Sequence, residues 1–112
     1  MRVVACRRRN LTTFRQYLRV TDKSDNAVEA YLRDLRLFSE WFESSNGEEM
    51  TPEGITPIDV REYKAHLLQV RSFKPATVSR RLASISAFCE WARNQELIVA
   101  NPTEGIGNVQ EV

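Results

Sequence analysis

The sequence predicts an all-α domain of four to five helices, and three observations support this fold class. Apolar residues recur at the 3.6-residue spacing of an amphipathic helix in successive segments. Two of these segments begin with a proline, Pro57 and Pro75, at a position where the first turn of a helix tolerates it. No segment shows convincing strand character. The length of 112 residues fits one domain of this kind.

The first two helices are predicted on either side of a polar break at residues 21–24. Residues 1–10 are expected to form a loose basic tail, followed by a helix from Leu11 to about Val20. The second helix is expected to take Ser24 or Asp25 as its N-cap and to run to about Glu43. Its apolar face comprises Val28, Tyr31, Leu32, Leu35, Phe38 and Phe42. Its opposite face comprises Asn26, Glu29, Arg33, Arg36 and Glu40, with room for ion pairs four residues apart.

A polar, acidic loop is predicted at residues 44–55, before the third helix. Thr56 is expected to cap that helix, with Pro57 in its first position and Asp59 at the positive end of its dipole. The third helix runs to about Val70. Its predicted inward residues are Ile58, Tyr63, Leu67 and Val70.

The fourth helix is predicted from Pro75 to about Asn94 and has two dissimilar faces. Its core stripe is Val78, Leu82, Ile85, Cys89 and Ala92. The opposite face carries small residues around one arginine: Ala76, Arg80, Ala83, Ser84 and Ala87. Small side chains permit close approach of another surface, and an arginine among them can reach phosphates or a guanine edge. An ordinary alanine-rich helix has the same pattern.

Charge is segregated along the chain although the net charge is only +1. Residues 1–20 carry six arginines and no acid, and residues 63–82 carry five basic residues and no acid. Residues 43–62 between them are mainly acidic. A polarised surface of this kind can steer association with a polyanion, although arginine-rich tails also serve solubility alone.

The residues give no sign of a catalytic, metal or cofactor site. One histidine, His66, and two distant cysteines do not form a metal-site spacing, and no glycine-rich phosphate loop or nucleophile–base–acid set occurs. No apolar run reaches the roughly 20 residues of a membrane span. We therefore expect a cytoplasmic protein without membrane association, cofactor or metal.

Four motifs in order resemble the N-terminal core-binding, or SAM-like, domain of tyrosine recombinases and phage integrases. Residues 26–38 (NAVEAYLRDLRLF) resemble its T-x-x-x-Y-x-x-D-L-x-x-F signature, and residues 77–88 (TVSRRLASISAF) its T-x-x-R-x-L helix. Residues 55–63 (ITPIDVREY) resemble its third helix, and Asn101-Pro102 its closing pair. The similarity covers residues 11–103, with departures at Ala27, Lys74 and Ser86. Residues 104–112 would begin a linker to a catalytic domain.

The resemblance implies a DNA-binding domain whose second and fourth helices cross in the major groove of a core recombination site. The implied DNA contacts are Asn26, Ala30, Arg33, Arg36, Lys74, Ala76, Thr77, Arg80, Arg81 and Ser84. Lys74 and Arg81 would contact phosphates. The implied partners are double-stranded DNA, a C-terminal catalytic domain of the same parent chain, and other protomers of a recombination tetramer.

The resemblance also implies that this chain alone is not an enzyme. The family's catalytic residues belong to the C-terminal domain, and Tyr17, Tyr31 and Tyr63 fall in core-facing patterns here. A competing hypothesis is a helical protein-interaction module that uses Trp41 and Trp91. A helix-turn-helix regulator is a weaker alternative, because the loop at 44–55 is long for the turn of that motif.

Overall fold

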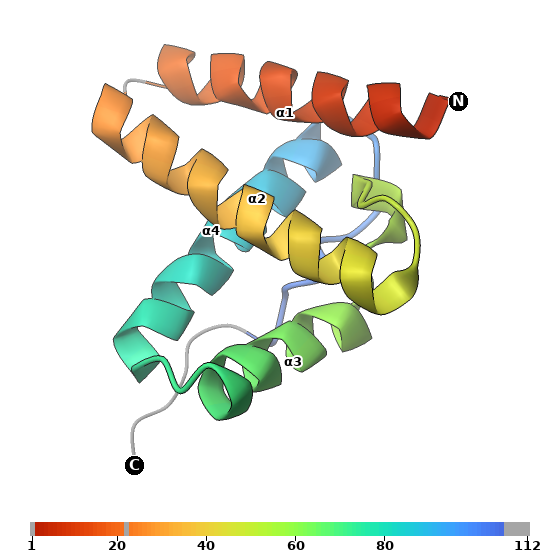
Figure 1. The fold of residues 1–112 in the computed structure, drawn as a ribbon. Helices are drawn as coiled ribbons and strands as arrows, with labels where there is room; N and C mark the ends of the chain where they lie inside the picture. The colour runs from red at the N-terminus through yellow and green to blue at the C-terminus, as the bar shows by residue number, and fades with distance from the viewer. Residues whose placement is uncertain (1, 22, 107–112) are drawn as a thin grey trace. The chain divides into compact units, whose positions relative to one another are not determined.

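The computed structural model describes residues 2–21 and 23–106, with side chains from residue 11 onward. Within these residues the chain is all-α, as predicted, with four α-helices and no strand (Figure 1). It divides into two compact units, Met1–Thr51 and Pro52–Val112. The first unit contains the helices α1 (Arg2–Val20) and α2 (Asp25–Asn46). The second contains η1 (Pro52–Gly54), α3 (Pro57–Ala65), η2 (His66–Val70) and α4 (Pro75–Asn94).

Helix α1 begins nine residues before the predicted start at Leu11. The backbone of residues 2–10 is helical, so the expectation of a loose tail is wrong for this segment; its side chains lie outside the described part. Neither glycine nor proline occurs between Arg2 and Val20, and arginine and alanine favour helix. Phe14 and Leu18 are buried, whereas Tyr17 is 37% exposed.

Helix α2 is bounded by two well-defined caps. The Ser24 side chain accepts a hydrogen bond from the Ala27 backbone N–H at 3.2 Å, which confirms the predicted start. The helix ends at Asn46, three residues beyond the predicted Glu43, because Gly47 adopts the left-handed conformation with φ 74°. Glycine adopts this conformation without the steric cost of a Cβ atom.

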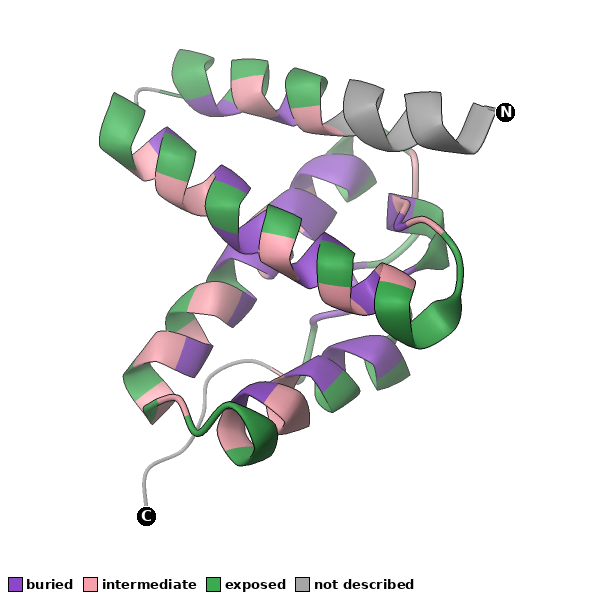
Figure 2. Ribbon diagram, in the orientation of Figure 1, coloured by how far each residue is buried: buried purple, intermediate pink, exposed green. Residues whose placement is uncertain are grey.

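The two faces of α2 separate as its sequence predicts (Figure 2). Most of the predicted apolar face is buried: Val28, Leu32, Leu35, Phe38 and Phe42. Tyr31 is only half-buried, and the Lys23 ammonium lies 5.6 Å from the centre of its ring. The opposite face is exposed at all five predicted positions, Asn26, Glu29, Arg33, Arg36 and Glu40. Helix α1 packs alongside α2, and Arg15 pairs with Glu29 at 2.8 Å.

The connection between α2 and α3 is less uniformly polar than predicted. It contains the short 3-10 helix η1, and Met50, Pro52 and Ile55 are buried. These three apolar residues alternate with exposed or half-exposed polar ones. The segment therefore contributes to the protein interior and is not simply a solvated loop.

Helix α3 starts with the predicted cap, strengthened by a second hydrogen bond. Thr56 Oγ1 accepts from the Asp59 N–H at 3.2 Å, while the Asp59 carboxylate accepts from the Thr56 N–H at 3.0 Å. This reciprocal pair is a capping box. It satisfies two backbone donors that a helix start otherwise leaves without partners.

The inward face of α3 differs from the prediction at two of its four positions. Tyr63 and Leu67 are buried, but Ile58 is 61% exposed and Val70 is 70% exposed. Val60, which the prediction left out, is buried and lies three residues before Tyr63. Beyond Ala65 the chain continues as the π-helical turn η2, whose wider turn rotates Val70 away from the stripe.

Helix α4 has the predicted bounds, Pro75–Asn94, and the predicted core stripe. Val78, Leu82, Ile85, Cys89 and Ala92 are all buried. The buried arc is wider than the stripe and also takes in Ser84, Phe88 and Trp91. The outer-face assignment of Ser84 is therefore wrong: this side chain is 4% exposed. It lies beside Ile85 at the edge of the buried arc.

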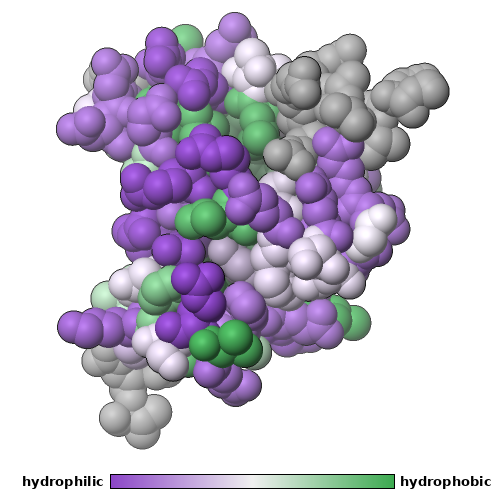
Figure 3. Space-filling view, viewed as in Figure 1, coloured by the Kyte–Doolittle hydropathy of each residue, from purple (hydrophilic) through white to green (hydrophobic). Residues whose placement is uncertain are grey.

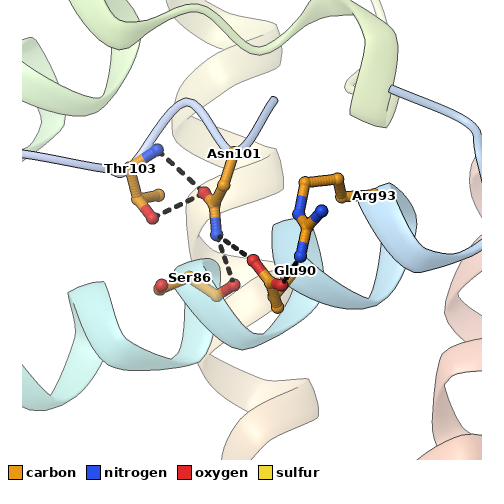
Figure 4. A network of polar contacts seen from close by, with 5 residues as sticks. All are labelled: Ser86, Glu90, Arg93, Asn101 and Thr103. Atoms are coloured by element: carbon orange, nitrogen blue, oxygen red, sulfur yellow. Dashed lines mark hydrogen bonds and ion pairs between the residues drawn. The ribbon is translucent and has the colours of Figure 1, made fainter. Parts of the chain in front are cut away.

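The segment after α4 is fastened to that helix by Asn101 (Figure 4). The Asn101 amide donates to the Ser86 carbonyl and to Glu90, both at 3.3 Å. Its oxygen accepts from the Thr103 N–H at 2.9 Å and from the Thr103 hydroxyl at 2.6 Å. Glu90 also pairs with Arg93. This network, the Asn101 clamp, holds the buried residues 101–103 against α4.

The Asn101 clamp should weaken at acidic pH. Hydrogen bonds from Arg93, and then from Asn101, lower the pKa of Glu90 below its ordinary value of 4.5. The folded state therefore binds this proton less tightly than the unfolded chain, so the stabilisation is full above pH 4.5 and disappears as the pH falls through the lowered pKa. We expect Glu90→Gln to lose stability less steeply than the wild type as the pH falls from about 5 to about 3. Urea unfolding at several pH values measures this, and parallel profiles for the two proteins would contradict it.

Candidate nucleic-acid interface

The second unit contains a long stretch of sequence with basic but no acidic side chains. Between Glu62 and Glu90 there is no aspartate or glutamate. The five basic residues of this stretch are Lys64, Arg71, Lys74, Arg80 and Arg81. They occupy the end of α3, the turn that follows η2, and the first half of α4. This arrangement gives the start of α4 a positive potential that favours polyanions.

The outer face of α2 presents two arginines to solvent. Arg33 and Arg36 are exposed, and neither forms an ion pair within the described residues. Glu29, which lies four residues before Arg33, pairs with Arg15 of α1 instead. Asn26 is exposed and Ala30 is half-buried. Hydrophilic side chains cover most of the face of α2 that Figure 3 shows. These features suit contact with a polar surface such as a nucleic-acid backbone.

Most of the residues predicted on the outer face of α4 are exposed or half-buried. Ala76 and Arg80 are exposed and Thr77 is half-buried. Ser84 does not belong to this exposed face, because it is buried. Its hydroxyl donates a hydrogen bond to the Arg80 carbonyl at 3.5 Å. The remaining face presents one long cation between small side chains.

Lys74 and Arg81 lie at the start of α4, but in different environments. Lys74 is exposed at the N-cap position, where its side chain makes no capping hydrogen bond. Arg81 is half-buried, and its guanidinium carbon lies 4.5 Å from the centre of the Phe73 ring. The Arg71 guanidinium carbon lies 5.1 Å from the centre of the same ring. Arg71 and Phe73 are not among the contacts predicted from the sequence, although the run of basic residues without acids includes this segment.

Part of the small-residue face of α4 has a packing role. Ala83 and Ala87 line a groove of about 450 Å³. The other residues lining it are Val60, Leu82, Ser86, Glu90, Thr103 and Ile106. The methyl side chains leave space between α4 and the segment that the Asn101 clamp attaches. The small residues at 83 and 87 therefore have a structural explanation that Ala76 lacks.

The predicted contacts thus fall into two sets. Asn26, Ala30, Arg33 and Arg36 belong to the first unit, and Lys74, Ala76, Thr77, Arg80 and Arg81 to the second. Each set lies on one helix or at its start. That both sets meet one DNA groove stays a prediction.

Only one of the three tyrosines is fully buried. Tyr63 is 2% exposed, whereas Tyr17 is 37% exposed and Tyr31 is half-buried. The prediction that all three face the core is therefore wrong for Tyr17. Among the described residues no three histidine, cysteine, aspartate or glutamate side chains gather into a possible metal site. No helix in this part of the chain is both long and apolar enough to span a bilayer.

Cys89 is buried, as its place on the core stripe predicts. Burial, and secondarily the nearby Glu90 charge, raises the pKa of its thiol to about 12. The reactive thiolate is therefore scarce near neutral pH. This cysteine behaves as a small apolar residue of the core.

Comparison with known proteins identifies the family. A family model described as the phage integrase N-terminal SAM-like domain matches residues 11–98. Tyrosine recombinase XerC from two serovars of Leptospira interrogans, copenhageni and Lai, is 31% identical over 90 residues. These matches cover 80% of this chain and 28% of each relative. A TnP I resolvase of Bacillus thuringiensis is 26% identical over 78 residues, covering 70% of this chain and 27% of the resolvase.

The chain spans less than a third of the length of these relatives. No solved structure matches it. The family model nevertheless covers most of the 112 residues, including α2, α3 and α4. The chain therefore belongs to the phage integrase N-terminal SAM-like domain family.

Proposed function

We propose that this domain binds duplex DNA and holds the core recombination site for a tyrosine recombinase. The observation that carries the proposal is family membership combined with exposed, unpaired arginines on the outer face of α2. Arg33 and Arg36 project from a helix whose other face is buried, so they contribute to binding without being needed for packing. Arginine suits this role because its planar guanidinium hydrogen-bonds phosphates and guanine edges in pairs.

The proposed contacts are of two kinds, contacts to base edges and contacts to phosphates. Arg80, on the small-residue face of α4, has the reach to hydrogen-bond a base edge in the major groove. Ala76 and Thr77 beside it let the helix come close to the groove wall. Lys74 and Arg81 at the start of α4 bind phosphates, which fixes the position of the domain on the duplex but carries little sequence information.

The remaining steps of recombination belong to other parts of the assembly. The relatives are more than three times as long as the matched segment, which leaves room for a catalytic domain in the parent chain. The proposed partners are therefore that domain, further protomers of a recombination tetramer, and DNA in the cytoplasm. On this proposal the domain grips DNA and takes no part in strand cleavage.

Replacing Arg80 and Lys74 separately should distinguish base reading from phosphate binding. We expect Arg80→Ala to weaken binding to a duplex selected from a random pool by about 1–3 kcal/mol, with a smaller effect on a scrambled duplex. Lys74→Ala should weaken binding to both duplexes alike. Fluorescence anisotropy titrations of the wild type and the two variants give the six dissociation constants.

Circular dichroism provides the folding control for both variants, since neither side chain is buried. Equal losses on the two duplexes for Arg80→Ala would contradict its role in reading bases. An Arg80→Ala protein that unfolds would show that this face of α4 is structural.

A protein-interaction module is the weaker candidate. It would use exposed tryptophan surfaces, but Trp91 is 3% exposed and Trp41 is half-buried. The Trp91 ring stacks on Phe88 at 5.7 Å between centres and so serves the interior of its own unit.

A further inference from the structure

Two arginines lie against one aromatic ring just before α4. The guanidinium carbons of Arg71 and Arg81 are 5.1 Å and 4.5 Å from the centre of the Phe73 ring. Lys74 follows Phe73 directly and is exposed. We call these four residues the Phe73 cluster. Stacking on an aromatic face orients a guanidinium while leaving its N–H edge available for other hydrogen bonds.

The backbone that presents the Phe73 cluster is unusual in two respects. The π-helical turn η2 ends at Val70, and the backbone N–H groups of Arg71 and Phe73 donate to the carbonyls of His66 and Leu67, each at 3.0 Å. Ser72, between the two, has a left-handed φ of 55°. A residue other than glycine adopts this conformation at a cost in free energy. The turn therefore fixes how Arg71 and Phe73 sit relative to α4.

The charges of the Phe73 cluster are not compensated within the described residues. Neither Arg71 nor Arg81 forms an ion pair there, and the sequence has no acid from residue 63 to residue 89. Arg81 Nε is buried and has no hydrogen-bond partner in this part of the chain. Two guanidinium groups beside one ring repel each other, and water screens this repulsion only in part because Arg71 is exposed but Arg81 is half-buried. A bound anion would offset this repulsion, because it attracts both guanidinium groups.

We propose that Arg71 and Arg81, oriented by Phe73 and assisted by Lys74, form a clamp for the phosphate backbone of duplex DNA. The inference rests on the proposed DNA-binding function and adds two residues, Arg71 and Phe73, to it. Phosphate oxygens accept paired hydrogen bonds from guanidinium groups at short distance. Arg71 and Arg81 touch the phosphate, whereas Phe73 is a positioning residue that acts through them.

Three single variants test the proposed phosphate clamp of the Phe73 cluster. Arg71→Gln removes one charge from the Phe73 cluster. Phe73→Leu keeps every charge and most of the apolar volume but removes the ring. Arg61→Gln is the matched control, because Arg61 is an exposed arginine of α3 outside the Phe73 cluster. Affinity for a random-sequence duplex is measured for each at several salt concentrations, with circular dichroism melts to verify folding.

We expect Arg71→Gln to weaken binding about tenfold and to reduce the salt slope by about 0.9, the value for one lost phosphate contact. Phe73→Leu should also weaken binding although the net charge is unchanged, and Arg61→Gln should retain most of the affinity. Equal losses of affinity from Arg71→Gln and Arg61→Gln would overturn the phosphate clamp while leaving the proposed function in place. Wild-type affinity in Phe73→Leu would do the same. A wild-type protein that binds no duplex would overturn the proposed function and the clamp with it.

Discussion

Replacing Phe88 with alanine should lower the free energy of unfolding by about 3–5 kcal/mol. Phe88 is 1% exposed, and its ring stacks on Trp91 at 5.7 Å between centres. The substitution removes buried apolar surface and leaves a cavity that the well-packed side chains of α4 cannot fill. The shift of the urea midpoint, at constant denaturant dependence, measures the loss.

Arg80→Ala is the matched control on the same helix, because Arg80 is exposed. A change within about 0.5 kcal/mol is expected there, as for other surface substitutions. If Phe88→Ala leaves the midpoint in place, Phe88 is not part of a packed core and the described burial of α4 is wrong.

Raising the salt concentration should release the domain from duplex DNA. The candidates for phosphate contact are four basic residues of the two predicted sets, Arg33, Arg36, Lys74 and Arg81, together with Arg71 of the Phe73 cluster. Five such contacts give a salt slope near −4.5, about a 500-fold loss of affinity between roughly 50 and 200 mM salt. Binding titrations at four or more salt concentrations yield the slope.

The double variant Arg33→Gln, Arg36→Gln provides an internal reference. Its slope should be shallower by about 1.8 if both arginines contact phosphates. An affinity that stays constant across the salt range would count against DNA binding and in favour of a protein partner.

The fold was predictable where helix signals are local. Ser24, the Thr56–Pro57 pair and Pro75 each marked a helix start that the structure contains. The stripe from Val78 to Ala92 identified the buried face of α4 because a regular helix preserves its spacing.

The prediction was wrong where the helical spacing of apolar residues is interrupted. It was also wrong where a run of arginines was interpreted as a sign of a loose tail. The π-helical turn η2 shifts Val70 off its stripe, and no side-chain pattern announces such a turn. Arg7, Arg8 and Arg9 suggested a solvated tail, yet their segment contains no residue that prevents a helix.

The candidate site was partly predictable for a related reason. The exposed arginines of α2 and Arg80 of α4 follow from the helical faces alone. Ser84 lies at the boundary between faces, where the extent of neighbouring packing decides burial and spacing does not. Arg71 and Phe73 meet Arg81 only because the chain turns back through Ser72, which the sequence does not reveal.

The alanines of α4 also have a consequence for the entropy of association. Ala76 and Ala83 are exposed and have no side-chain rotamers to lose when another surface approaches. A longer residue at either position would lose about 0.5–1.5 kcal/mol of conformational freedom on being immobilised. On this face that cost falls mainly on Arg80, so a partner that engages α4 here immobilises few side chains.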